Sequence, residues 1–138
     1  MKKYLLLVLL AFTAMFTLAG CDKRKVVGEW ELIGVSYNAE EITVREFLKA
    51  ISPDYDDAMI ENEYTFFMYD TTLRFNKDKT GMLGMMDFTW EYESGEIEGE
   101  FQNSYLDDFE AVLTKDRLYL EIDFYDLGYD ITLIYEKK

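Results

Sequence analysis

The stretch FEAVLTKDRLYLEIDFY, residues 109–125, decides the fold of this chain. In its second half, from residue 117 onward, apolar side chains alternate with acidic residues and tyrosines. One face carries Leu118, Leu120, Ile122 and Phe124, and the other carries Tyr119, Glu121, Asp123 and Tyr125. A period of two is typical of a strand with one buried face. Residues 109–114 continue the pattern before Lys115-Asp116, so the stretch predicts an antiparallel hairpin.

The same pattern extends outward in both directions along the chain. We expect further strands at residues 71–76, 82–92, 96–101 and 129–135, with turns at Gly81, Ser94-Gly95 and residues 126–128. Residues 26–37 predict a first strand, in which Gly28, Trp30 and Leu32 share one face. Ile33 and Val35 make the other face partly apolar, so we expect both faces to be covered near its end. Short, evenly spaced strands favour a mainly all-β sandwich or barrel over alternating strands and helices.

One segment breaks this period. Between residues 42 and 51, the apolar residues follow the spacing of an amphipathic helix. Thr43 and Glu46 fit a capping box, and Pro53 disfavours helical geometry in the residue before it. Residues 54–62 are ambiguous, and residues 63–69 fit either a short strand or a further helical turn. The sequence therefore predicts a short helical insertion after the first strand.

Composition limits the classes of partner. The chain of 138 residues has 14 basic and 28 acidic residues, a net charge of −14, and from Val26 onward 9 basic residues stand against 27 acidic ones. Such a charge repels phosphate, so we expect no nucleic-acid partner. It attracts cations and basic proteins, although a simple role in solubility explains it too. The 11 tyrosines, 10 phenylalanines and 2 tryptophans provide large apolar surfaces for one modest core.

The N-terminus has the parts of a secretory signal. Lys2 and Lys3 precede an uncharged apolar run, residues 4–20, which ends in small residues. An uncleaved membrane-spanning helix and a plain secreted protein are the alternatives. The apolar run is a little shorter than the roughly 20 residues that a span needs.

The exit of this signal, Leu18-Ala19-Gly20-Cys21, resembles the lipobox of bacterial lipoproteins. The resemblance implies that the thiol of Cys21, the only cysteine, receives a diacylglyceryl group and that the signal is cut before it. We therefore expect a signal peptide at residues 1–20, a lipidated tether at 21–25 and one domain at 26–138. Two or more acyl chains hold a protein stably on a membrane. The implied location is the bacterial cell envelope, lipid-anchored and facing the periplasm.

The order of motifs in the domain also resembles a family. Gly28-Glu29-Trp30 comes in the first strand, Phe75-Asn76-x-Asp78-x-Thr80-Gly81 follows the helical insertion, and Phe88-Thr89-Trp90-Glu91-Tyr92 comes later. Together these are similar to the lipocalin-like domains of bacterial lipoproteins. The resemblance implies an eight-stranded antiparallel β-barrel in which Trp30 plugs the closed end. It also implies a later arginine packed on that tryptophan, for which Arg74 and Arg117 are the candidates.

Few residues suggest chemistry. The chain has no histidine, which excludes a histidine-based triad or an imidazole metal site. Residues 76–81 have the oxygen spacing that begins a calcium loop, but a hairpin turn explains them equally through the tolerance of Asn and Gly for turn conformations. Met82, Met85 and Met86 could hold Cu(I) or line an adaptable pocket, and we expect them instead to fill gaps in the packing.

These observations lead to a prediction of a non-enzymatic protein without metal or cofactor. Carboxylate pairs are abundant, as a glycosidase would require, but acidic residues on strands are typical of a solvated outer face. The first hypothesis is a membrane-anchored lipocalin-like barrel that binds a small apolar ligand. The alternative is an acidic interaction module of the envelope that binds a basic protein, for example as a hydrolase inhibitor.

Overall fold

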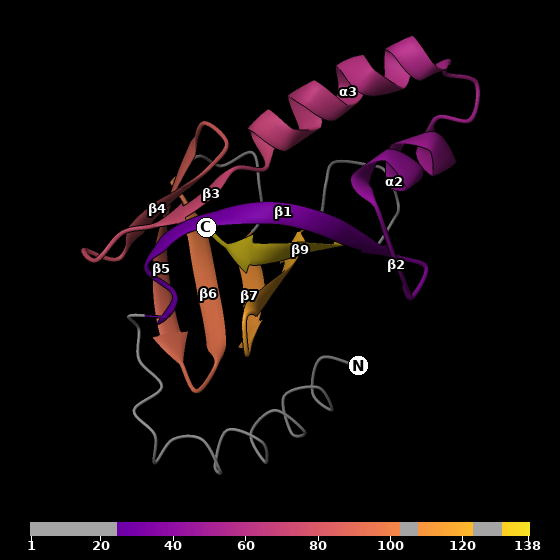
Figure 1. Cartoon of the computed structure of the whole chain (residues 1–138). Helices are drawn as coiled ribbons and strands as arrows, with labels where there is room; N and C mark the ends of the chain where they lie inside the picture. The colour runs from indigo at the N-terminus through magenta and orange to yellow at the C-terminus, as the bar shows by residue number, and fades with distance from the viewer. Residues whose placement is uncertain (1–24, 103–107, 123–130) are drawn as a thin grey trace.

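The computed structural model describes residues 25–102, 108–122 and 131–138 (Figure 1). It is mainly β, with two helices inserted early in the chain. In chain order the elements are β1 (Gly28–Tyr37), β2 (Glu40–Ile42), α2 (Val44–Ile51), α3 (Asp57–Asp70), β3 (Leu73–Phe75), β4 (Thr80–Leu83), β5 (Met86–Glu93), β6 (Glu96–Phe101), β7 (Phe109–Thr114), β8 (Arg117–Ile122) and β9 (Ile131–Lys137).

Strand β1 closes the sheet into a barrel. Strands β3 to β9 pair with their neighbours in sequence order, and all these pairings are antiparallel. One edge of β1 pairs with β9 from Trp30 to Tyr37, and the other edge pairs with β3 from Gly28 to Trp30. The expected eight-stranded antiparallel barrel is thus confirmed. The extra strand β2 pairs with the end of β1, on the same edge as β3.

A bulge in β1 changes which residues face the core. Leu32 pairs with Tyr135 and Gly34 with Ile134, so Ile33 is an extra residue in the strand. The side chain of Ile33 is 37% exposed, whereas Val35 is fully buried opposite Leu133. Ile33 and Val35 therefore do not share a face as expected, but the expectation that both faces of β1 are covered near its end is confirmed, because the consecutive residues Gly34 and Val35 are both buried. A bulge shifts the alternation by one residue, and a strict period of two does not reveal it.

Two tight hairpins follow the sequence pattern, whereas the turn expected at Gly81 lies earlier, at residues 76–79, because Gly81 is already paired within β4. Ser94 and Gly95 both have positive φ, as a type I′ turn requires, and Lys115-Asp116 joins β7 to β8. The single strand predicted at residues 82–92 was wrong, because Gly84-Met85 turns the chain between β4 and β5. Gly84 has φ +59°, and a Cβ there would lie 2.5 Å from the carbonyl oxygen of Asp70, so only glycine fits beneath the end of α3.

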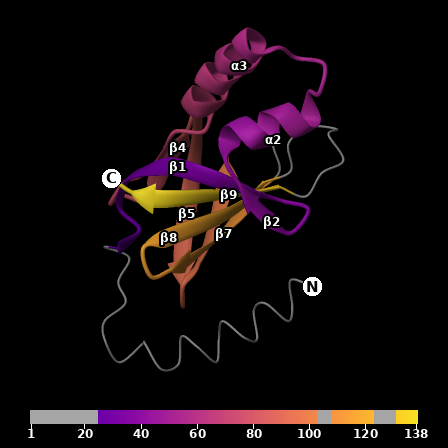
Figure 2. The ribbon, with the colours of Figure 1, turned by 45° about the vertical axis from the view of Figure 1, so that its right-hand side comes forward.

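The two ends of the barrel differ. Three short turns, at residues 76–79, 94–95 and 115–116, lie at one end, which we call the turn end. At the opposite end, which we call the helix end, lie β2, the two helices and the turn at 84–85 (Figures 1 and 2). The connections between β6 and β7 and between β8 and β9 also join strand ends there, but residues 103–107 and 123–130, including the turn predicted at 126–128, lie outside the described residues.

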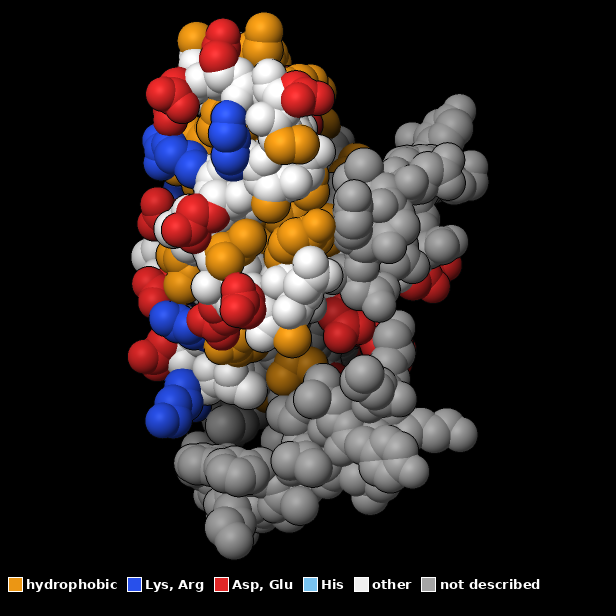
Figure 3. Space-filling model, turned by 90° about the vertical axis from the view of Figure 1, so that its right-hand side faces the viewer, with side chains coloured by type: hydrophobic (Ala, Val, Ile, Leu, Met, Phe, Trp, Pro, Cys, Tyr) orange, Lys and Arg blue, Asp and Glu red, His pale blue; other side chains and the backbone are white. Residues whose placement is uncertain are grey.

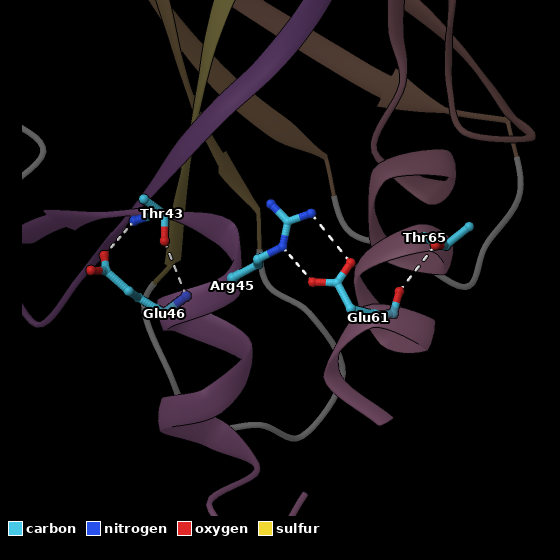
Figure 4. Close-up of polar contacts among 5 residues, drawn as sticks. All are labelled: Thr43, Arg45, Glu46, Glu61 and Thr65. Atoms are coloured by element: carbon cyan, nitrogen blue, oxygen red, sulfur yellow. Dashed lines mark hydrogen bonds and ion pairs between the residues drawn. The ribbon is translucent and has the colours of Figure 1, made fainter. Parts of the chain in front are cut away.

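Helix α2 forms where the sequence predicts it. The hydroxyl of Thr43 accepts a hydrogen bond from the backbone N–H of Glu46, at 3.1 Å, and the carboxylate of Glu46 accepts one from the N–H of Thr43, at 2.8 Å (Figure 4). This capping box satisfies two donors that a helix start leaves without partners. Val44, Phe47 and Leu48 are the buried residues of the helix, and the ring of Phe47 packs against that of Tyr37 on β1.

Helix α3 settles the part of the insertion that the sequence left ambiguous. Residues 57–70 form one continuous helix that begins at the N-cap Asp56, whose carboxylate accepts from the N–H of Met59. Arg45 of α2 donates two hydrogen bonds to the carboxylate of Glu61, with atom separations of 2.6 and 3.3 Å (Figure 4). The guanidinium carbon of Arg45 lies 3.8 Å from the centre of the Tyr64 ring. These contacts hold the two helices together.

A buried hydrogen bond fixes the insertion to the barrel. The hydroxyl of Tyr135, on the inner face of β9, donates to the carbonyl of Thr71 at 2.6 Å. Tyr135 is fully buried, and burial raises the pKa of its phenol, so it stays a neutral donor. Thr71 is 1% exposed, and its own hydroxyl donates to the carbonyl of Phe67 in the last turn of α3. The end of α3 is therefore tied to β9, 64 residues away in sequence.

Replacing Tyr135 by phenylalanine tests this tie. We expect Tyr135→Phe to lower the free energy of unfolding by about 1–3 kcal/mol, because the Thr71 carbonyl then stays buried without its donor. Urea unfolding followed by tryptophan fluorescence measures the change. Tyr69→Phe is the control, since the Tyr69 side chain is 58% exposed. Equal stability of the two variants would contradict the role given to the hydroxyl.

Candidate functional site

At the turn end, Trp30 is buried beneath a lysine. The indole is 3% exposed, and its N–H donates to the carbonyl of Val26 at 2.8 Å. The ammonium nitrogen of Lys137, on β9, lies 5.7 Å from the centre of the indole ring, within range of a cation–π interaction. Gly28 has φ +131°, and a Cβ there would lie 3.1 Å from Cε of Lys137. Gly28 thus leaves room for the lysine that covers Trp30.

Neither arginine expected on this tryptophan is there. Arg74 on β3 pairs with Glu29, and Arg117 on β8 pairs with Glu41 and Glu136, all on the outer surface. Lys137 takes the position instead, and partial burial lowers the pKa of its ammonium. The contact between Lys137 and Trp30 could not be predicted from the sequence. It depends on the register between β9 and β1, which puts Lys137 directly opposite Trp30.

Aromatic rings fill the interior beside β3 to β7. Phe88 meets the rings of Phe75, Phe101 and Phe109 with centroids 5.4, 6.0 and 4.9 Å away, all edge to face. Trp90 packs edge to face on Phe75, and its N–H donates to the carbonyl of Thr80 at 2.9 Å. Such pairs contribute about 0.5–1.5 kcal/mol beyond the area that they bury. This part of the barrel is packed with side chains.

Two glycines make that packing possible. A Cβ on Gly81 would lie 2.3 Å from the Phe88 ring, and a Cβ on Gly99 would lie 2.0 Å from the ring of Phe109. Each ring lies flat over the backbone of the strand beside it, since Gly81 pairs with Phe88 and Gly99 with Phe109. The glycine of the motif at residues 75–81 thus serves the core and not a metal loop.

The opposite wall of the interior is aliphatic. Leu118 and Leu120 of β8 and Leu133 of β9 are fully buried, and the small Ala111 of β7 pairs with Leu120. Toward the helix end, the ring of Phe47 bridges Tyr37 and Phe67, at centroid distances of 5.5 and 5.9 Å. All inward side chains among the described residues belong to one apolar core, and no buried polar side-chain atom described lacks a hydrogen-bond partner.

A row of glutamates crosses the outer face of four strands. Glu91 of β5 pairs in register with Glu98 of β6, Glu98 with Glu110 of β7, and Glu110 with Glu121 of β8. Directly opposite side chains lie about 4.5–5.5 Å apart at Cβ, so four carboxylates stand side by side on the surface. We call these four residues the glutamate row. No sequence pattern shows it, because it arises only when the registers of four strands are known.

Glu96 extends this negative field. It pairs with Glu93 beside the turn at Ser94-Gly95. Burial raises the pKa of its carboxyl, and the neighbouring charges of Glu110, Glu98 and Glu93 raise it further. Within the glutamate row, the carboxylate of Glu91 forms an ion pair with the ammonium of Lys79, and the nitrogen–oxygen distance is 2.6 Å.

The candidate calcium loop is used as a turn. Asp78 accepts hydrogen bonds from the backbone and hydroxyl of Thr80, which lowers the pKa of its carboxyl. The amide of Asn76 donates to the same hydroxyl at 3.1 Å. Within the described parts of the chain, no three or more cysteine, aspartate or glutamate side chains are arranged so that they could hold a metal ion.

The three methionines do not come together either. Met86 packs against the core, but Met82 is 37% exposed and Met85 is 75% exposed in the turn at residues 84–85. The expectation that all three fill gaps was wrong for Met82 and Met85. The unforeseen turn separates them, so that Met82 and Met86 lie on different faces of the β4–β5 hairpin.

Cys21 lies outside the described residues. In the portions that the structure covers, no helix combines the length and apolar character needed to cross a bilayer. A comparison with models of known protein families finds no match, and a comparison with curated proteins finds no significantly similar relative.

Removing the Glu96 carboxylate tests how far repulsion from the neighbouring glutamates lowers the stability of the fold. Because the pKa of Glu96 is raised in the folded state, its ionised form is destabilising. We expect Glu96→Gln to stabilise the fold by about 0.2–1 kcal/mol at neutral pH. The gain should vanish as the pH falls below the ordinary value of 4.5, where the carboxyl is protonated in both states.

Urea unfolding at neutral pH and at a pH about one unit below that value measures this difference. Glu40→Gln is the control, since Glu40 pairs with Tyr37 and not with another acid. A gain that is the same at both pH values would argue against the electrostatic explanation.

Proposed function

We propose that this protein is a non-enzymatic, lipid-anchored lipocalin-like barrel of the bacterial envelope that binds one small apolar ligand. The observation that carries the proposal is the closed eight-stranded barrel with an entirely apolar described interior. Barrels of this size are either filled by side chains or hold one small ligand. Trp30 is buried at the turn end, as the proposed closed end requires, and the helical insertion covers part of the helix end.

The aliphatic wall is the better place for the ligand. Rings, including that of Phe109 on β7, occupy the β3–β7 side, whereas the wall beside them is formed by Ala111 of β7, Leu118 and Leu120 of β8 and Leu133 of β9. These aliphatic side chains are at most 1% exposed, so a ligand enters by displacing them. The ligand must be apolar, because a polar group there would lose its hydrogen bonds to water without gaining new ones. The lipobox at residues 18–21 supports a lipid anchor at Cys21 and an envelope location.

Native mass spectrometry tests the ligand. We expect protein extracted from membranes in mild detergent to retain the mass of one apolar molecule. Ala111→Phe should reduce this adduct several-fold, because the added ring would compete with the ligand for the region beside Leu120. Glu110→Gln, on the outer face of the same strand, is the matched control. A wild-type chain that carries only its own mass would contradict ligand binding.

The N-terminus of the mature protein tests the anchor. We expect the wild-type chain to begin at a Cys21 whose sulfur carries a diacylglyceryl group. Cys21→Ser should retain residues 1–20 and lack the lipid, and globomycin, which blocks lipoprotein signal cleavage, should also leave residues 1–20 attached. Intact-protein mass spectrometry measures both. An unmodified Cys21 thiol in the wild type would rule out the anchor.

A second candidate function is the binding of a basic protein, and two surfaces favour it. The glutamate row concentrates negative charge on β5 to β8. On α3, the side chains of Met59, Phe66 and Tyr69 are 51%, 58% and 58% exposed among acidic residues. Figure 3 shows hydrophobic and acidic side chains together at the upper end of the molecule. Binding of such a partner should weaken steeply with added salt, whereas retention of an apolar ligand should not.

A further inference from the structure

We propose that the turn end of the barrel faces the membrane and that its lysines contact anionic phospholipid headgroups, while the helical insertion points away from the bilayer. This inference rests on the proposed lipid anchor at Cys21. It adds the orientation of the domain and a lipid-facing surface.

The path of the chain supports this orientation. The carbonyl of Lys25 accepts a hydrogen bond from the ammonium of Lys137 at 2.9 Å, and the next carbonyl, that of Val26, accepts from the Trp30 indole. The chain therefore enters the barrel held against the turn end. Cys21 precedes Lys25 by four residues. Such a link spans at most about 14 Å, so a lipid on Cys21 keeps the turn end close to the headgroups.

The distribution of charge points the same way. Ten basic residues lie from Lys25 onward, and six of them are at the turn end, in its turns or near the ends of the described chain. These six are Lys25, Lys77, Lys79, Lys115, Lys137 and Lys138. The same turns and chain ends contain the acidic residues Asp78, Asp116, Glu29 and Glu136, with Glu93 and Glu96 beside them, so acidic and basic residues balance at this end. By contrast, residues 38–72 at the helix end carry nine acidic and two basic residues. The turn end is thus nearly neutral, whereas the helix end is strongly acidic.

Because salt screens charges over short distances, the charge of the end nearest the bilayer determines the orientation of the domain. At physiological salt, charges more than about 8 Å apart interact little, so an anionic bilayer senses mainly the nearest end of the domain. Basic residues near such a surface are attracted to it, and acidic ones are repelled. The competing orientation would insert the exposed apolar residues of α3 into the bilayer, and the acidic residues around them oppose it.

Depth-dependent quenching in vesicles tests the orientation. The full acylated chain is reconstituted in vesicles of phosphatidylethanolamine and phosphatidylglycerol that contain a headgroup spin label. Fluorophores are attached to a new thiol in Ser94→Cys, at the turn end, or in Met59→Cys, on α3, since acylated Cys21 does not react. We expect strong quenching at position 94 and weak quenching at position 59. Equal quenching, or stronger quenching at position 59, would overturn the orientation.

Charge-neutralising variants test the role of the lysines. Lys77→Gln combined with Lys115→Gln should reduce quenching at position 94 by about twofold in anionic vesicles and leave it unchanged in phosphatidylcholine vesicles. Lys49→Gln, on α2 in the helical insertion, is the matched control and should have no effect. If the double variant behaves like the control in anionic vesicles, the proposed contact with headgroups is wrong.

Flotation of the vesicles separates the two proposals. Protein that is not acylated and does not float with either lipid composition would refute the lipid anchor, and the orientation with it. Protein that floats but shows reversed quenching would refute the orientation alone.

Discussion

Strand β1 pairs along both of its edges, and this double pairing closes the sheet. At its start it joins β3 and β9 together, and Trp30 lies at the place where all three strands meet. The bulge at Ile33 then lets the strand bend while Val35 returns to the core. Without this closure, β3 and β9 would be open edges with unpaired backbone groups, and the aromatic interior would be exposed to water.

Closure also divides the barrel into two chemical faces. The described inward residues form one apolar core, and the acidic residues that the structure describes lie on the outer surface or in the helical insertion. On the outer face the strand registers place four glutamates side by side, an arrangement that is unfavourable in itself. The fold tolerates it because solvent and salt screen exposed charges and because the interior contributes the stability.

The helical insertion gives the molecule its asymmetry. It separates β2 from β3 along one edge of β1, and it is held by the capping box, by the Arg45–Glu61 pair and by the Tyr135–Thr71 hydrogen bond. Most of the lysines and the start of the described chain, Lys25, lie at one end, and the acidic helices with their exposed apolar residues lie at the other. This polarity supports the proposed orientation, in which one end meets lipid and the other stays accessible.

The sequence by itself determined most of the strands, the helix at residues 44–51 and an all-β sandwich or barrel, and the family resemblance favoured the barrel. Alternation, capping residues and turn residues act between neighbours in the chain, so they can be read without a structure. It also carried the lipobox at Cys21 and the Gly28–Trp30 motif. Only the tertiary structure decided the β1 bulge, the turn at Gly84, the lysine over Trp30, the glutamate row and the tie between Tyr135 and Thr71. Each of these depends on register or on contacts between segments far apart in the chain, such as the 64 residues between Thr71 and Tyr135. Local patterns carry no information about such distances, because register is set by closure of the whole sheet.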